Sequence, residues 1–255
     1  MSRPFSLVQL SDPHIGADWA EGDPTARLAA AVDAVLSVGR HDAVLVSGDL
    51  ADHGSDAEYE VVRELLASLR APVHVVAGNH DDRAVLRRHF DMPGTDREPV
   101  QYSTDLGPVR LVVIDTTIPG EDPGALDSER LEWLDAELAA APEASTIVAM
   151  HHPPILTGSP VWDDLGLPFA DRAALRDVIA RHRQVRRIVA GHVHRTMSGE
   201  LDGTPVLTVP STYVQARLNF DSQELELTPD PAGFGVHVVV DGELTSHVES
   251  VATRR

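Results

Sequence analysis

Five short segments of the sequence carry the side chains that proteins use to bind divalent metal ions. They are Asp12-Pro13-His14, Gly48-Asp49, Gly78-Asn79-His80-Asp81, His151-His152-Pro153-Pro154 and Gly191-His192-Val193-His194. Carboxylate, imidazole and amide oxygen groups are ligands for Mn, Fe, Zn or Co. Asp12 and His14 lie two residues apart, so both side chains can reach one ion from the same side of an extended segment. The same spacing separates His192 from His194.

Asp49 could bind two ions at once, because one carboxylate can bridge two ions roughly 3.5–4 Å apart, the spacing of two-metal hydrolases. Gly48 before Asp49, and Gly78 before Asn79, allow the backbone to turn tightly there. Each segment alone is a weak signal, since an Asp-x-His pair arises by chance in many proteins. All five in this order, each after an apolar strand, make chance a poor explanation.

The predicted strands and helices place the five segments at one edge of a sheet. Strands predicted at 5–10, 43–47 and 73–77 alternate with helices at 24–38 and 56–69, which is typical of a parallel sheet with crossover helices. Asp23 and Pro24 are the N-cap and the first residue of the first helix, and Ser55 or Asp56 is the N-cap of the second. Open α/β sheets place ligand sites outside the carboxyl ends of their strands.

The rest of the chain predicts more strands, and two long loops. A helix is predicted at 82–90, a hairpin at 100–115, helices at 128–140 and 171–182, and strands at 146–150 and 187–190. Asp202-Gly203 and Asp241-Gly242 are strong hairpin signals. Residues 15–22, with Trp19, and residues 156–169, with Trp162, are predicted loops. We expect one domain of residues 1–255 with two packed sheets, and a β-rich segment from about residue 196.

Composition excludes several kinds of chemistry. The 255 residues contain no Cys and no Lys, which excludes disulfides, a cysteine nucleophile, a P-loop lysine and a Schiff-base lysine. The net charge of −19 argues against a nucleic acid polymer as partner, because binding a polyanion normally needs a basic surface. No signal peptide and no apolar window of about 18 residues is visible, so we expect a cytoplasmic protein without membrane partners.

The five segments in this order resemble the calcineurin-like metallophosphoesterase superfamily, over residues 6 to about 212. The narrower resemblance is to bacterial class III cyclic-nucleotide phosphodiesterases and glycerophosphodiesterases. It rests on Ser11-Asp12-Pro13-His14, Ala149-Met150-His151-His152-Pro153-Pro154, Val209-Pro210-Ser211-Thr212 and Ala232-Gly233-Phe234. The resemblance implies an α/β fold: a four-layer αββα sandwich of two mixed β-sheets with outer helices.

Carried over to this sequence, the resemblance implies two divalent metal ions. One set of ligands would be Asp12, His14, Asp49 and His194, and the other Asp49, Asn79, His151 and His192. His80 would be catalytic without binding metal, and Asn79 and His80 would contact the substrate. The two ions would lower the pKa of a shared water, whose hydroxide attacks phosphorus, and His80 could protonate the leaving oxygen.

Several alternatives remain open at this stage. The expected substrate is a small phosphodiester, with a 3′,5′-cyclic nucleotide such as cAMP first and a glycerophosphodiester second. A phosphomonoesterase, a nucleotide pyrophosphatase and a catalytically silent scaffold are further possibilities. The metals and the oligomeric state, a homodimer or higher homo-oligomer included, are not determined by the sequence.

Seven residues near the motifs have two interpretations each. Asp52, His53 and His152 could support the ligands or be structural, and Asp81 could bond to His80 or to the loop. Trp19, Trp162 and Tyr213 could stack on a nucleobase or simply pack. His237, with five other histidines outside the motifs, is interpreted as a surface or packing residue.

Overall fold

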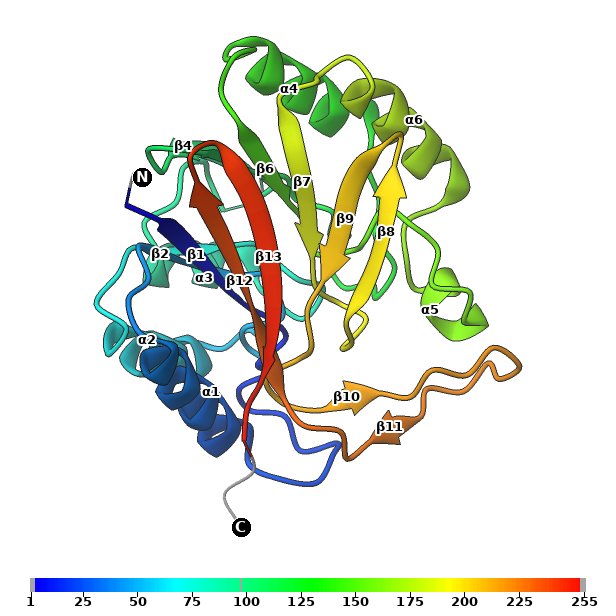
Figure 1. The fold of residues 1–255 in the computed structure, drawn as a ribbon. Coiled ribbons are helices and arrows are strands. Elements are labelled where there is room, and N and C mark those ends of the chain that lie inside the picture. The colour runs from blue at the N-terminus through cyan, green and yellow to red at the C-terminus, as the bar shows by residue number, and fades with distance from the viewer. Residues whose placement is uncertain (1–2, 97, 253–255) are drawn as a thin grey trace.

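Two β-sheets packed face to face form the centre of the molecule, and helices lie along their outer sides (Figure 1). The computed structural model describes residues 3–96 and 98–252. The first sheet has the order β13-β12-β1-β2-β3 and the second the order β4-β5-β6-β7-β9-β8. Both are mixed, since β1 is parallel to β2 and antiparallel to β12, while β5 is parallel to β6 and antiparallel to β4.

The strands of the first sheet come from both ends of the chain. They are β1 (Phe5–Leu10), β2 (Ala43–Val46), β3 (Val73–Val75), β12 (Gly233–Val240) and β13 (Glu243–Ser250). Because β12 pairs with β1 of the same chain, the C-terminal hairpin completes this sheet. The helices beside it are α1 (Pro24–Val38), α2 (Asp56–Ala67) and α3 (Arg83–His89).

The second sheet is built from the middle of the chain. Its strands are β4 (Tyr102–Asp105), β5 (Arg110–Val113), β6 (Thr146–Ala149), β7 (Val185–Ala190), β8 (Met197–Leu201) and β9 (Thr204–Thr208). Its helices are α4 (Ser128–Ala139), α5 (Pro160–Asp164) and α6 (Phe169–Ile179). The expected four-layer αββα sandwich is therefore confirmed.

Three apolar layers separate these four layers. Alternate residues of β1 point to opposite faces, so Val8 and Leu10 pack towards α1 and α2 while Leu7 packs between the sheets. Leu111 and Ile147 of the second sheet join Leu7 in that middle layer. Burial on both faces explains why the central strands are continuous apolar runs.

Local signals account for the helix starts. Asp23 accepts a hydrogen bond from the amide of Thr25, and Pro24 begins α1. Ser55, and not Asp56, caps α2, because its side chain and that of Glu58 form a reciprocal capping box.

Two segments differ from the sequence-based expectation. Residues 156–169, expected to be a loop, contain the short helix α5, which Pro160 begins. Residues 215–228 form an arm, defined by the strands β10 (Gln215–Ala216) and β11 (Leu227–Thr228), that projects beside α5 (Figure 1). Within residues 3–96 and 98–252, no helix combines the length and apolar character needed to span a bilayer.

Candidate metal centre

The five segments meet where strands of the two sheets end. Asp12 and His14 follow β1, and their amides donate to the carbonyls of Gly48 (3.1 Å) and Asp49 (2.9 Å) beyond β2. Across the sandwich, the amide of Gly191 after β7 donates to the carbonyl of His151 after β6 at 3.0 Å. The ligand-bearing loops are therefore tied to one another in pairs before any side chain is considered.

Five of the predicted ligands have left-handed backbone, which is uncommon for residues other than glycine. They are Asp12 (φ 49°), His14 (φ 45°), Asp49 (φ 50°), His192 (φ 69°) and His194 (φ 47°). Backbone of this kind persists only where the surrounding structure holds it, and it concentrates at functional sites.

One group of side chains contains Asp12, His14 and His194. The Nε2 atoms of His14 and His194 lie 3.1 Å apart, and His194 Nε2 lies 3.8 Å from Asp12 Oδ1. Asp49 joins this group, because its Oδ2 lies 3.5 Å from His14 Nε2. All four side chains are buried.

A second group lies on the other side of Asp49. The same Oδ2 atom lies 3.3 Å from His151 Nε2. Asn79 Oδ1 lies 3.0 Å from His151 Nε2 and 3.2 Å from His192 Nδ1. One carboxylate oxygen of Asp49 thus lies between two clusters of donor atoms.

The donor set fits a divalent cation. Asp12 and Asp49 are buried carboxylates, and among residues 3–96 and 98–252 their ion-pair partners are histidines. A buried anion needs a compensating charge. Cations between these carboxylates and imidazoles would supply that charge.

Hydrogen bonds fix the ring orientation of three of the histidines. In each, Nδ1 faces an acceptor at 2.9 Å: Asp52 Oδ1 for His14, the Ser47 carbonyl for His151 and the Val214 carbonyl for His194. Because carbonyl and carboxylate oxygens only accept, Nδ1 carries a hydrogen and Nε2 is the nitrogen that faces the cluster. Such hydrogen bonds orient metal-binding imidazoles in many sites.

The protonation tendencies of most of the ligand candidates agree with metal binding. Burial lowers the pKa of His14, lowers that of His194 to about 4, and holds that of His192 well below its usual range. Burial opposes ionisation of Asp49, but the attraction of His151, His14 and His80 together outweighs it and keeps the carboxyl pKa well below its usual range. The same attraction raises the pKa of His151 to about 9, so His151 carries a proton that a bound ion would displace. Neutral imidazoles and ionised carboxylates are the forms that bind metal.

His80 lies at the border of the cluster. Its amide donates to Asp49 Oδ1 at 2.9 Å, its Nδ1 lies 3.1 Å from the Asp52 carbonyl, and 33% of its side chain is exposed. Burial lowers the pKa of His80, but the nearby Asp49 carboxylate and Asp52 outweigh this, so the pKa is raised overall.

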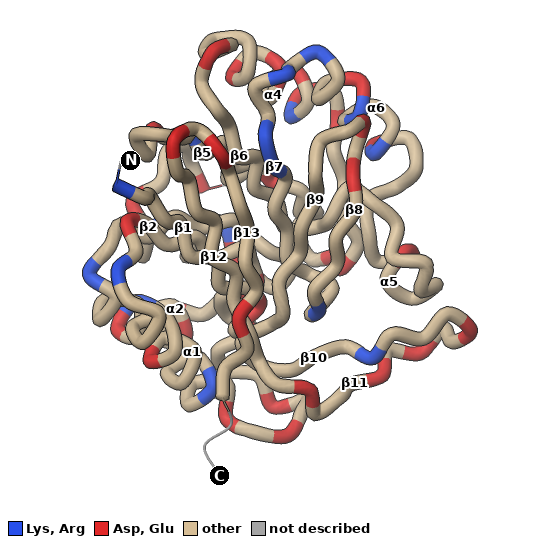
Figure 2. Tube along the Cα trace, viewed as in Figure 1, with Lys and Arg blue, Asp and Glu red and all other residues tan. Residues whose placement is uncertain are grey.

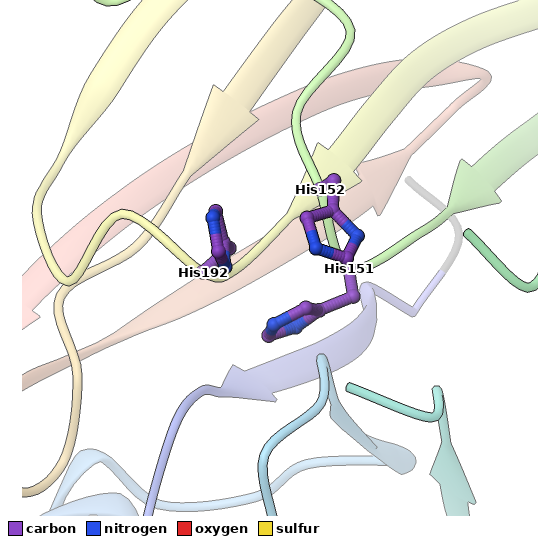
Figure 3. Close-up of side chains that lie close together, drawn as sticks. All are labelled: His151, His152 and His192. Carbon is purple, nitrogen blue, oxygen red and sulfur yellow. The ribbon is translucent and has the colours of Figure 1, made fainter. Parts of the chain in front are cut away.

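His152, in contrast, has both ring nitrogens occupied. Nδ1 lies 2.8 Å from Thr116 Oγ1 and Nε2 lies 3.0 Å from the Asp122 carbonyl. Burial lowers its pKa to about 3. Figure 3 shows its ring beside those of His151 and His192, at the ends of β6 and β7. His152 therefore packs against ligand candidates and anchors the loop at Asp122.

Two carboxylates hold the loops around the site. Asp52 Oδ1 accepts from Trp19 Nε1 (3.0 Å) as well as facing His14. Asp81 accepts from the amides of Leu50 (3.1 Å) and Gly78 (2.9 Å), so it bonds to the loop and not to His80. His53 is exposed and pairs with Glu58, away from the ligand cluster.

A cavity of about 250 Å³ opens onto the cluster. Its polar lining includes Asp49, Asn79, His80, Asp122, His192 and His194, and its apolar lining is Trp19, Trp162, Leu165, Leu225 and Leu227. The Trp162 ring meets that of His192 edge to face, with centroids 5.4 Å apart. Tyr213 is buried, and its hydroxyl donates to the Ala20 carbonyl at 2.8 Å, so it packs against Trp19.

Sequence reasoning did not identify Leu165, Leu225, Leu227 or Asp122 as cavity residues. The two leucines at 225 and 227 belong to the arm, whose position depends on contacts distant in sequence. No local pattern of the kind used for the metal ligands marks them.

Comparison with known proteins decides the family. The family model described as calcineurin-like phosphoesterase matches residues 5–196. The chain belongs to the calcineurin-like phosphoesterase family. It is therefore a metal-dependent phosphoesterase, and the matched range includes all five segments.

Individual relatives of this phosphoesterase are of two kinds. A cAMP/cGMP dual specificity phosphodiesterase of Mycobacterium tuberculosis is 36% identical, covering 83% of this chain and 69% of that protein. A 3′,5′-cyclic adenosine monophosphate phosphodiesterase of Pseudomonas aeruginosa is 35% identical, over 82% of this chain and 76% of its own. A glycerophosphodiester phosphodiesterase of Enterobacter lignolyticus is 31% identical, over 84% and 77%.

Solved structures agree on the fold. A dimetal phosphatase from Danio rerio superposes with a TM-score of 0.68 at 17% identity, covering 97% of this chain and 99% of that one. A purple acid phosphatase from yellow lupin reaches a TM-score of 0.73 at 17% identity, covering 98% and 52%.

Proposed function

We propose that this phosphoesterase holds two divalent ions and hydrolyses a small phosphodiester, with 3′,5′-cyclic AMP as the first candidate. The observation that supports the two-ion site is the position of Asp49 Oδ2, 3.5 Å from His14 Nε2 and 3.3 Å from His151 Nε2. A carboxylate that lies between two groups of donor atoms can bridge a pair of ions.

The ligands fall into the two groups already described. Asp12, His14, Asp49 and His194 would hold one ion, and Asp49, Asn79, His151 and His192 the other. When bound, the ions lower the pKa of water and withdraw charge from phosphoryl oxygens. Mn, Fe, Zn and Co all suit this donor set.

His80 and Asn79 would act on the substrate. Because the Asp52 carbonyl occupies Nδ1 of His80, Nε2 is the nitrogen available to the substrate, and the ring is partly exposed to the cavity. His80 can hydrogen-bond a phosphoryl oxygen and deliver a proton to the leaving oxygen. The amide nitrogen of Asn79 is a further donor, since its oxygen faces the two histidines.

The lining of the cavity favours a cyclic nucleotide. Trp19, Trp162 and three leucines offer apolar and aromatic surface next to the metal cluster. A nucleobase has flat faces that stack on aromatic side chains. The volume of about 250 Å³ suits a small molecule.

A second candidate, a glycerophosphodiester, is supported by a different observation. A more polar cavity of about 650 Å³, lined in part by His53, Asp82 and Arg83, meets the first one at Asn79 and His80. A linear diester carries two organic groups, and each could occupy one of the two cavities. Similar relatives of this activity add weight to the alternative.

A substrate comparison separates the candidates. The protein would be freed of metal with a chelator and reloaded with Mn²⁺, and kcat/KM would be measured for cyclic AMP, glycerophosphoethanolamine and bis(p-nitrophenyl) phosphate. We expect at least a ~10-fold preference for cyclic AMP over the glycerol diester. The reverse preference would assign the chain to glycerophosphodiesters, and no activity on any of the three would refute a phosphodiesterase.

A further inference from the structure

A line of buried polar side chains crosses the apolar layer between the two sheets. Gln9, Ser11, Ser47 and His237 each have 0% exposure. Gln9 and His237 belong to β1 and β12, and Leu7, the register partner of His237, is part of the apolar middle layer. Polar groups in such a place are costly unless each has a hydrogen-bond partner.

The partners form one continuous chain that ends at a predicted metal ligand. At one end, His237 Nδ1 lies 2.7 Å from Ser246 Oγ, and His237 Nε2 lies 3.0 Å from Gln9 Oε1. Gln9 Nε2 in turn lies 2.9 Å from Ser47 Oγ. Ser47 Oγ lies 2.7 Å from Ser11 Oγ, and Ser11 Oγ donates to Asp12 Oδ2. Ser246, at the outer end, lies in β13 and is half-buried.

A backbone carbonyl determines the direction of every bond. Gln9 Nε2 also lies 3.0 Å from the Ala190 carbonyl, which can only accept. The amide nitrogen of Gln9 therefore faces Ala190 and Ser47, and its Oε1 must accept from His237. His237 is then a donor at Nε2 and an acceptor at Nδ1, which is the neutral imidazole.

The hydrogen bonds of Ser47 and Ser11 run in the same direction, from His237 towards Asp12. Ser47 accepts from Gln9 and has its hydroxyl hydrogen left for Ser11, which is closer (2.7 Å) than its other acceptor, the Leu10 carbonyl (3.3 Å). Ser11 gives its hydrogen to Asp12, because a carboxylate only accepts. Each donor in the chain thus points towards Asp12, and hydrogen bonds aligned in this way polarise one another.

The far end of the chain controls the orientation of the Asp12 carboxylate. Oδ2 is occupied by Ser11, while Oδ1 accepts from the His192 amide at 3.0 Å and faces His194 Nε2 at 3.8 Å. Rotation of the carboxylate would break the bond to Ser11. Oδ1 is therefore held towards the histidines.

We propose that Gln9 and His237 are positioning residues, which act through Ser47 and Ser11 to hold Asp12 ready for the ion that it shares with His14 and His194. The inference rests on the proposed two-metal site. It adds two residues that lie outside the five segments and whose side chains hydrogen-bond to Ser47, Ala190, Ser246 and each other, and not to the seven predicted ligands.

The test uses Mn²⁺ binding to the metal-free protein, measured by titration calorimetry, with the melting temperature of the metal-free protein as a second reading. Gln9→Met keeps the length of the side chain and removes its donor and acceptor. We expect it to weaken one of two binding steps by at least ~10-fold, within the range known for residues that orient metal ligands. The other step should change less than ~2-fold.

Two histidine variants separate hydrogen bonding from packing. His237→Phe removes the donor to Gln9 and should weaken the same step by ~3-fold or more. His237→Gln can still donate to Gln9 Oε1 and should bind Mn²⁺ within ~2-fold of the wild type. Equal weakening in both would mean that His237 acts by packing, which would overturn its part of the proposal.

Thr146→Val is the matched control. Thr146 is also buried, but its hydroxyl donates to the Ala144 carbonyl and takes no part in the chain of hydrogen bonds that leads to Asp12. The Thr146→Val variant should lower the melting temperature without changing either binding step. If Gln9→Met does not fold, Ser246→Ala at the half-buried end gives the same test with a smaller expected loss. Unchanged binding in a folded variant would overturn the inference alone, whereas a wild type that binds no Mn²⁺ would refute the metal site itself.

Discussion

The side chain of Asp49 is the point at which the two groups of predicted ligands join. Its Oδ2 faces a histidine of each group, and its Oδ1 accepts from the amide of His80. The left-handed backbone of Asp49, with Gly48 before it, allows this orientation. A Cβ at Gly48 would stand only 2.2 Å from His151 Nδ1, so a larger residue at this position would displace a predicted ligand.

Removing the imidazole of His80 should separate binding from turnover. We expect His80→Ala to keep both Mn²⁺ ions and to lose ~10²-fold or more in kcat on cyclic AMP, the usual contribution of a general acid. Metal content by atomic spectroscopy and steady-state rates check this. The exposed His247 provides the control, His247→Ala, which should match the wild type. A variant of His80 with normal turnover would exclude a catalytic role.

Burial of His237 should make the folding stability depend on pH, with a loss of stability in acid. Burial lowers its pKa to about 3, while the unfolded residue titrates near 6.5. Below pH 6.5 the unfolded chain takes up a proton that the folded chain rejects, so stability falls by up to ~1.4 kcal/mol per pH unit.

The measurement is the free energy of unfolding in urea, with chelator present, at pH 6.5, 5.5 and 4.5. The His237→Phe variant lacks this proton uptake, so its stability should decline less steeply than that of the wild type. The contribution of His152, whose pKa is also about 3, is common to both proteins. Parallel curves would contradict the assignment of a buried neutral imidazole.

The residues of the site could be predicted only where the signal was local. The seven ligand candidates occupy short motifs, each directly after a strand, and the structure brings all seven together. The partnership of Gln9 with His237 could not be predicted, because it depends on the register of β1 against β12. The assignment of the seven candidates as metal ligands, like the role of His80, stays a prediction.

At the scale of elements, the helices and hairpins that caps and turn residues mark could be predicted from the sequence. Elements that depend on tertiary contacts could not. Asp23-Pro24 and Asp202-Gly203 correctly mark the start of α1 and the turn of the β8–β9 hairpin. The helix α5 and the arm were missed. Both are short, and a short helix or a two-residue strand is stable only through the surface on which it packs.

The arm should determine which organic group the enzyme accepts. Leu225 and Leu227 line the cavity, and Phe220 packs over Gly158 next to α5, since a Cβ at Gly158 would stand 3.3 Å from the Phe220 ring. Replacing both leucines by serine should raise KM for cyclic AMP by ~10-fold, because apolar contact with the base is lost.

Bis(p-nitrophenyl) phosphate serves as the internal comparison, and its kcat should change less than ~2-fold because the metal cluster is untouched. Leu218→Ser, on the same arm but outside the cavity lining, is the control for general disturbance of the arm. Equal losses on both substrates would show that the arm supports the site as a whole instead of selecting a substrate.

At the scale of the whole molecule, the charge limits the partners. The net charge is −19, and Figure 2 shows acidic residues along much of the chain, the arm included. A single-stranded oligonucleotide contains the same phosphodiester group but needs basic contacts to bind. The oligomeric state, the single-domain organisation and the cytoplasmic location remain predictions.

Oligonucleotides should therefore be poor substrates at any ionic strength. We expect kcat/KM per linkage on a ten-residue single-stranded DNA to be below ~1% of that on cyclic AMP. Lowering the salt from 200 to 50 mM should bring no gain, because the net charge of −19 repels a polyanion and weaker screening strengthens that repulsion. Cleavage that rises steeply at low salt would contradict this view of the surface.

The most direct test of the central claim, two ions sharing Asp49, is the number of Mn²⁺ ions bound per chain. Metal-free wild type and Asp49→Asn would be titrated calorimetrically under the same conditions, with folding checked by circular dichroism. The account predicts two ions for the wild type and a loss of at least ~10-fold in affinity at both steps for Asp49→Asn, because the side chain faces both groups. A wild type that binds one ion or none, or a variant that still binds two as tightly, would contradict it.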